Sequence, residues 1–243
     1  MSIIIKDLDE SIISFMDLPE IVILMQCNKN YYSKIKDMQL IKQWNIMKRF
    51  IGEIDDLFIE ACKQNFIIYA QSLIARYPHI NIHKYNDDDD IYNAFQTSCI
   101  QGHLELAKWL KDLGETIRYS KVNIHLHDDF VFRVVCSKGQ IDIAKWLIDL
   151  GENHCYDKIN IHFQNEYCFE KACKEGQIKI AKWLIDLGEN HGYGKINIHD
   201  GDDYIFKTCC NYHQIDIAKW LIDLGENHGY GKFDQYIIDK YIK

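Results

Sequence analysis

The chain has 243 residues, of which 47% are hydrophobic, and a net charge of −8. This length suits one large domain or one stacked array of repeats, and the apolar content is sufficient for a core. The acidic balance argues against a nucleic-acid backbone as the main partner, because that contact requires a basic surface.

Cysteine usage and the N-terminus indicate the compartment. The nine cysteines are odd in number and show no paired spacing, which indicates a reducing environment. Residues Met1–Glu10 lack the basic start and apolar region of a signal peptide. No apolar run approaches the length of a membrane span. We therefore expect a soluble intracellular protein, located in the cytoplasm.

Residues 1–53 precede the repeats and are predicted to be helical, with a break at Pro19. One interpretation is a helical cap that covers the apolar face of the first repeat. The alternative is that residues 16–44 resemble a truncated F-box. That resemblance is carried by a Leu-Pro pair, a Tyr-Tyr pair and a closing Trp, namely Leu18, Pro19, Tyr31, Tyr32 and Trp44.

From residue 54 to residue 232 the chain repeats itself about five times with a period of 37 residues. Three residue types recur at this spacing: Phe58, Phe95, Phe132, Phe169 and Phe206; Cys62, Cys99, Cys136, Cys173 and Cys210; Trp109, Trp146, Trp183 and Trp220. A fixed period in this range indicates a solenoid or a similar array. The repeated cysteines are expected to be small buried side chains.

Each repeat is predicted to contain two helices. The first is short and carries apolar and small residues at helical spacing, such as Phe132 and Cys136. The second is polar only along one stripe, such as Asp142, Lys145 and Asp149, so its other sides are expected to be covered by neighbouring helices. The glycines after the second helices are predicted to end them in the left-handed conformation; they are Gly114, Gly151, Gly188 and Gly225.

The links between repeats carry the tripeptide Asn-Ile-His, at 81–83, 123–125, 160–162 and 197–199. We expect each histidine to bond the backbone of the neighbouring link. Shared metal binding is not expected, because packed helices lie about 10 Å apart and zinc bonds are near 2 Å. Residues 233–243 are predicted to form a short capping helix after the last repeat.

Residues 55–232 resemble ankyrin repeats. The run Gly102-His-Leu-Glu-Leu-Ala-Lys-Trp-Leu110 is similar to the second helix of that family, and Leu-Gly followed by Asn-Ile-His is similar to its hairpin. The family's own period is about 33 residues. The resemblance implies an all-α solenoid of helix-turn-helix repeats with short hairpin loops. Divergent arrays rich in Ile, Asn, Lys and Tyr are typical of large amoeba-infecting DNA viruses, which implies host proteins as partners and the host cytoplasm as location.

No motif for chemistry is present in the sequence. It contains no phosphate-binding loop, nucleophile elbow, zinc-protease helix or kinase signature. We therefore predict a protein that is not an enzyme and that has no cofactor, no metal and no nucleic-acid or membrane partner. The repeated tryptophans are interpreted as half-buried packing between repeats rather than as a platform for stacking bases.

Stacked repeats form an extended concave surface, so the predicted function is a protein-protein interaction scaffold. The positions expected to face outward are Tyr92, Asn93, Gln96, Asp129, Phe130, Arg133, Glu166, Tyr167, Glu170, Asp203, Tyr204 and Lys207. Among them, Phe130, Tyr167 and Tyr204 form an aromatic column at one repeat position, flanked by acids. Such a column fits a partner with apolar and basic features. The alternative is that these aromatic rings only pack along the ladder of repeats.

The F-box resemblance provides a second functional hypothesis. In it, the array recruits substrates to a ubiquitin ligase, and the adaptor docks on Leu18, Pro19, Tyr31, Tyr32 and Trp44.

Overall fold

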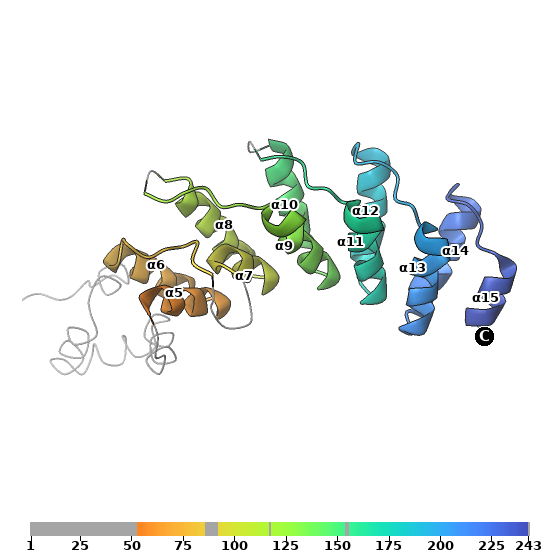
Figure 1. The fold of residues 1–243 in the computed structure, drawn as a ribbon, viewed down its shortest axis with the longest axis horizontal. Helices are drawn as coiled ribbons and strands as arrows, with labels where there is room; N and C mark the ends of the chain where they lie inside the picture. The colour runs from red at the N-terminus through yellow and green to blue at the C-terminus, as the bar shows by residue number, and fades with distance from the viewer. Residues whose placement is uncertain (1–52, 86–91, 117, 154–155, 243) are drawn as a thin grey trace, which may run out of the picture. The chain divides into compact units, whose positions relative to one another are not determined.

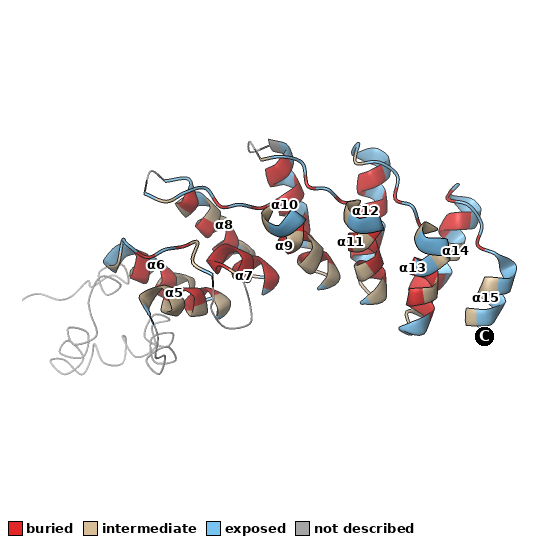
Figure 2. Cartoon of the chain, in the orientation of Figure 1, coloured by how far each residue is buried: buried red, intermediate tan, exposed pale blue. Residues whose placement is uncertain are grey.

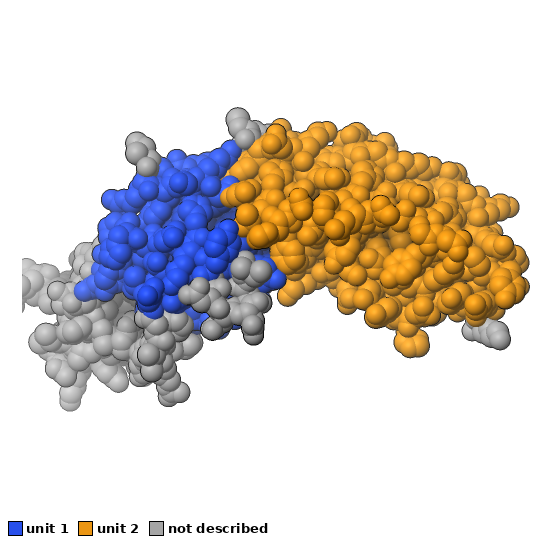
Figure 3. All heavy atoms as spheres, viewed as in Figure 1, with its two compact units in different colours: residues 1–122 blue, residues 123–243 orange. Residues whose placement is uncertain are grey.

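The computed structural model describes residues 53–85, 92–116, 118–153 and 156–242. Within these ranges every regular element is an α-helix, as Figure 1 shows. The predicted N-terminal cap and the F-box-like segment lie outside the described residues. The chain divides between Val122 and Asn123 into two compact units, which Figure 3 distinguishes by colour.

The described part of the first unit contains two helix pairs. Their bounds are α5 Ile54–Lys63, α6 Ile67–Arg76, α7 Ala94–Ile100 and α8 Leu104–Gly114. Helix α5 packs against its partner α6 and against α7, the first helix of the next repeat. The first helices of consecutive repeats are therefore in direct contact.

The second unit contains three helix pairs and one terminal helix. Their bounds are α9 Leu126–Ser137, α10 Ile141–Asn153, α11 Phe163–Lys174, α12 Ile178–Asn190, α13 Asp200–Asn211, α14 Ile215–Asn227 and α15 Gln235–Tyr241. Helix α11 packs against both α9 and α13, and each first helix packs against its own second helix. The predicted all-α architecture of stacked helix-turn-helix repeats is confirmed within each unit, which is the arrangement that the ankyrin-like resemblance implies.

Aromatic side chains connect consecutive repeats within each unit. Phe58, Phe132 and Phe169 are completely buried. The ring centroid of each lies close to that of the tryptophan one repeat later: 6.3 Å for Phe58–Trp109, 6.3 Å for Phe132–Trp183 and 6.2 Å for Phe169–Trp220. These tryptophans are half-buried, so the predicted packing role is confirmed. Figure 2 shows the buried stretches of each helix in red.

The repeated cysteines are buried, as the periodicity predicts. Burial raises the pKa of these thiols, which keeps them protonated. The thiols of Cys136 and Cys168 are neighbours, and so are those of Cys173 and Cys209. The 37-residue period did not predict these pairs, because Cys168 and Cys209 lie outside the repeated cysteine position.

The glycines of the second helices have a different role from the predicted one. None of Gly114, Gly151, Gly188 and Gly225 has a positive φ, and three of these helices continue beyond the glycine to an Asn. The expectation of left-handed helix ends is therefore wrong here. The reason for glycine is close approach, because a Cβ at Gly188 would lie 2.4 Å from the carbonyl oxygen of Gly194. The following link thus passes directly over the helix.

This close approach predicts whether one substitution stabilises or destabilises the protein. Ala normally stabilises a helix interior by about 1 kcal/mol over Gly. Gly188→Ala should instead destabilise the protein by about 1–3 kcal/mol, because a backbone atom occupies the space of the new methyl group. Urea denaturation of the full chain measures the difference.

The matched control is Gly192→Ala in the same link. Gly192 has a φ of +72°, and no atom lies within 4 Å of its Cβ position. Its substitution should cost only the left-handed strain of about 1–2 kcal/mol. A Gly188→Ala protein as stable as the unmodified chain would show that the link does not pass this close.

Candidate protein-binding surface

An unusual backbone turn begins each first helix of the second unit. Three consecutive residues have positive φ values between 47° and 60° in each copy: His127–Asp129, Gln164–Glu166 and Gly201–Asp203. A left-handed residue other than glycine costs roughly 1–2 kcal/mol. Such strain persists only where the surroundings compensate for it. Here the third residue of each turn is an acid that bonds the histidine four residues before it.

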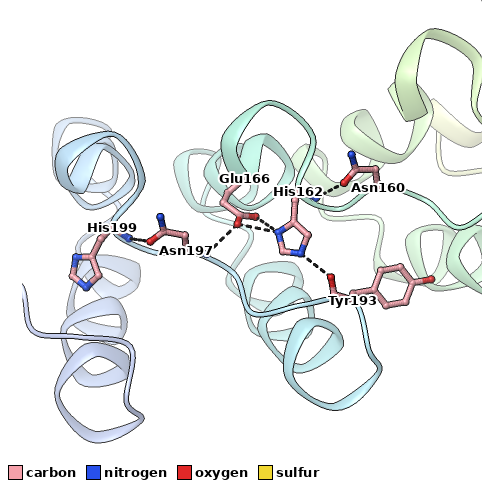
Figure 4. Close-up of polar contacts among 6 residues, drawn as sticks. All are labelled: Asn160, His162, Glu166, Tyr193, Asn197 and His199. Carbon is pink, nitrogen blue, oxygen red and sulfur yellow. Dashed lines mark hydrogen bonds and ion pairs between the residues drawn. The ribbon is translucent and has the colours of Figure 1, made fainter.

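In the middle copy this acid is Glu166, shown in Figure 4. Its two carboxylate oxygens lie 2.9 Å and 2.8 Å from Nδ1 of His162. One of them also accepts a hydrogen bond of 3.0 Å from the backbone N–H of Asn197, in the following link. Glu166 is buried, so these contacts replace its hydration.

His162 completes a connection between two repeats. Its Nε2 lies 2.8 Å from the carbonyl oxygen of Tyr193. Both ring nitrogens therefore face acceptors, and only the doubly protonated ring donates to both. Partial burial alone would lower the pKa of His162, but hydrogen bonds with Glu166 and Tyr193 and the Glu166 charge raise it above the ordinary value.

The same arrangement, a histidine bonded to the acid four residues later, occurs in the flanking copies, and we call it the His–acid clasp. His125 Nδ1 lies 2.5 Å from Asp129, whose second oxygen accepts 2.9 Å from the N–H of Asn160. His199 lies 2.5 Å from Asp203 through Nδ1 and 2.9 Å from the Gly231 carbonyl through Nε2. In the first unit, His83 Nε2 lies 2.8 Å from the Ser120 carbonyl. The predicted bonding of the repeated histidines to neighbouring links is thus confirmed for His83, His162 and His199.

Five of the twelve positions expected to face outward are buried instead. They are Asn93, Gln96, Asp129, Glu166 and Glu170. The outward orientation predicted for them is wrong because each has an intramolecular polar partner. Asn93 and Gln96 form a reciprocal cap at the start of α7, with hydrogen bonds of 3.0 Å and 3.1 Å. Glu170 contacts Lys171 at 3.3 Å.

The other seven positions are half-buried or exposed: Tyr92, Phe130, Arg133, Tyr167, Asp203, Tyr204 and Lys207. Tyr204 is the most open of the aromatic column, at 55% exposure. Phe130 and Tyr167 are half-buried and pack within the chain, as the alternative interpretation of the column describes.

The structure gathers three aromatic rings around one cation. The guanidinium carbon of Arg133 lies 4.5 Å from the ring centroid of Phe163, 5.6 Å from that of Phe130 and 5.7 Å from that of Tyr167. Arg133 also donates a hydrogen bond to the carbonyl oxygen of Asp128 in the left-handed turn. Stacking on rings holds the guanidinium plane in a fixed orientation.

Sequence reasoning missed four residues of this surface: Phe163, Lys171, Lys174 and Tyr212. Lys171 Nζ lies 4.8 Å from the Tyr167 ring, and Lys174 Nζ lies 4.3 Å from the Tyr212 ring. Both lysines follow Tyr167 at helical spacing, four and seven residues later, which was a usable signal. Phe163 offered none, because the equivalent positions hold different residue types.

The tyrosines of the long links also have defined partners. Lys158 Nζ lies 4.7 Å from the Tyr193 ring, and Lys195 Nζ lies 3.9 Å from the Tyr230 ring. Burial and the neighbouring Glu152 raise the pKa of Tyr193. Each link is therefore held by contacts with the repeat before it.

The described part of the chain contains no group of three or more His, Cys, Asp or Glu side chains placed to hold a metal ion. Among the helices described, none combines the length and the apolar character needed to cross a bilayer.

Comparison with known proteins does not assign a family to the chain. No protein-family model matches the sequence, and the search of curated proteins gave no match. Among solved structures, the chain is similar to the ankyrin repeat domain of human ASB11. The two chains share 21% identity over 72% of each, with a TM-score of 0.47.

The His162 clasp predicts a pH dependence of stability. A histidine whose pKa is raised by folding contributes stability fully below its unfolded pKa, about 6.5, and loses that contribution as pH rises through the folded value. The difference in unfolding free energy between the unmodified chain and His162→Gln should therefore be larger near about pH 6 than near about pH 8.5. Urea denaturation at each pH measures it.

His228→Gln is the control, because the His228 side chain is 60% exposed and its one carboxylate contact, with Asp223, is long, at 3.7 Å. Its effect should be small at both pH values. If the difference in unfolding free energy between the unmodified chain and His162→Gln stays constant, or becomes larger at high pH, the ring is neutral in the folded chain.

Proposed function

We propose that this protein is a non-enzymatic interaction scaffold whose partner protein binds the face formed by α9, α11 and α13. The observation that supports it is an aromatic side chain at one register position of all three helices, with Tyr204 exposed, and cationic side chains on the same helices. Tyr and Arg are enriched among the residues that dominate binding energy. Host proteins in the cytoplasm are the partners that the resemblance to viral arrays implies.

Proximity labelling in the host cell, followed by binding measurements with the purified partner, tests this proposal. Tyr204→Ala should weaken binding by at least about tenfold, since truncating an aromatic hot spot costs about 2 kcal/mol or more. The same measurement on Phe130→Ala and Tyr167→Ala shows whether these half-buried rings also take part.

Tyr236→Ala provides the matched control. Tyr236 is 73% exposed but lies on α15, outside the proposed face. This variant should keep the affinity of the unmodified chain. Equal affinities of the Tyr204→Ala and Tyr236→Ala proteins would place the partner elsewhere.

The F-box-like segment supports a second function, substrate recruitment to a ubiquitin ligase. Its residues lie outside the described part of the chain, so the support comes from the sequence motif alone. Co-purification of the full chain with the ligase adaptor, lost when residues 1–50 are deleted, would establish it. A full-length protein that does not bind the adaptor would exclude it.

A further inference from the structure

Three acidic side chains of α9 and α11 are buried rather than exposed on the face of α9, α11 and α13: Asp129, Glu166 and Glu170. The carboxylates of Asp129 and Glu166 are buried, and each bonds a histidine and a backbone N–H of the following link. Glu170 is 8% exposed. Since their acceptor capacity is used inside the chain, these acids offer little to a basic partner.

Four cations remain on the same face: Arg133, Lys171, Lys174 and Lys207. Lys171 is paired with Glu170 at 3.3 Å, and Lys207 with Asp202 at 3.1 Å. Within the described ranges, no carboxylate lies at ion-pair distance from Arg133 or Lys174. Arg133 contacts rings and a backbone oxygen, and Lys174 contacts the Tyr212 ring.

Some acids stay near this face. Asp128 and Asp202 are exposed in the left-handed turns, and Glu175 is exposed beside Lys174 at the end of α11. The backbone oxygens of Asp128 and Asp202 accept hydrogen bonds from Arg133 and Lys207, so cations lie next to both turns. Each of these three acids therefore lies beside a cation of the face.

We propose that this face binds a polypeptide segment in which acidic residues alternate with apolar ones. A guanidinium fixed by rings and with N–H groups still available can bind a carboxylate in the bidentate geometry that arginine favours. Tyr204 and Tyr212, 55% and 52% exposed, provide apolar surface on the neighbouring repeat. The partner is thus the opposite in charge to the one that the acidic sequence positions suggest.

This inference rests on the proposed function and specifies the chemistry of the partner. A random-peptide phage library selected against the full-length chain provides the probe. The enriched peptides should be rich in Asp and Glu interleaved with aromatic or aliphatic residues. Fluorescence anisotropy of the best peptide, and of a matched peptide with Lys at every acidic position, then gives the two affinities.

Charge reversal tests where the peptide binds. The double variant Arg133→Glu and Lys174→Glu should lower the affinity for the acidic peptide by at least about tenfold. The control is Lys145→Glu with Lys219→Glu, exposed positions on α10 and α14 that change the net charge equally. It should leave the affinity within about twofold. Since Arg133 is part of a ring cluster, thermal melts of both proteins and the milder Arg133→Gln variant separate lost binding from lost folding.

The outcomes distinguish this inference from the proposed function. Basic or uncharged peptides whose binding is lost in Tyr204→Ala would overturn the inference and leave the scaffold function standing. An acidic peptide that binds the charge-reversed and control proteins equally would also overturn it. A single-stranded oligonucleotide that displaces the peptide at lower concentration would reassign the face to nucleic acid. Peptides insensitive to every substitution on this face, or no enriched peptide at all, would count against both ideas.

Discussion

The contact between a phenylalanine and the tryptophan of the next repeat is the constraint on which both units depend. A single helix pair cannot cover its own phenylalanine, and burying one such side chain is worth about 1.5–3 kcal/mol. The tilted pairing of the rings adds about 0.5–1.5 kcal/mol. Phe206, in the last described first helix, meets Phe233 instead, with ring centroids 4.9 Å apart. Phe233 thus occupies beside Phe206 the place that a tryptophan has beside three other phenylalanines.

The hydrogen bonds of buried polar groups also depend on the next repeat. The left-handed turns of the second unit are strained, and two of them are stabilised because Asp129 and Glu166 each accept a hydrogen bond from a backbone N–H of the following link. The first unit uses another solution at α7, where Asn93 and Gln96 cap the helix. In α5, the backbone N–H of Asn81 bonds the Asp55 carboxylate at 3.0 Å. Asp55 holds the register position of Asp129 and Glu166 but has no positive φ, so an acid at this position bonds the link with or without a left-handed turn.

The repeat period was sufficient to predict the helices, the buried phenylalanines and cysteines, and the packing of the tryptophans. These properties follow from apolar spacing, which the sequence displays directly. The role of Gly188 was not predictable in this way, because the reason for glycine is a backbone oxygen contributed by another segment. A glycine at the end of a predicted helix is compatible with either cause.

The burial of Asp129, Glu166 and Asn93 was missed for a related reason. Charged and polar residues were expected to face outward because burial is costly without a partner. The partner of each acid was present four residues earlier, as His125 and His162, but this spacing places two side chains together only after the backbone turn is known. The ring cluster around Arg133 depends on the same turns, which decide that Phe163 reaches the preceding repeat.

The difference between net charge and local charge has a consequence for recognition. The chain carries −8 overall, and exposed acids such as Asp142 and Asp149 lie on the second helices. Packed helices are about 10 Å apart, whereas charges are screened over about 8 Å at physiological ionic strength. A partner on the first helices therefore experiences Arg133 and Lys174 more strongly than the acids of the other layer. Net charge then governs how the whole molecule repels or attracts others at a distance, whereas the local charge of the proposed binding face depends on which carboxylates are buried against histidines, as those of Asp129 and Glu166 are.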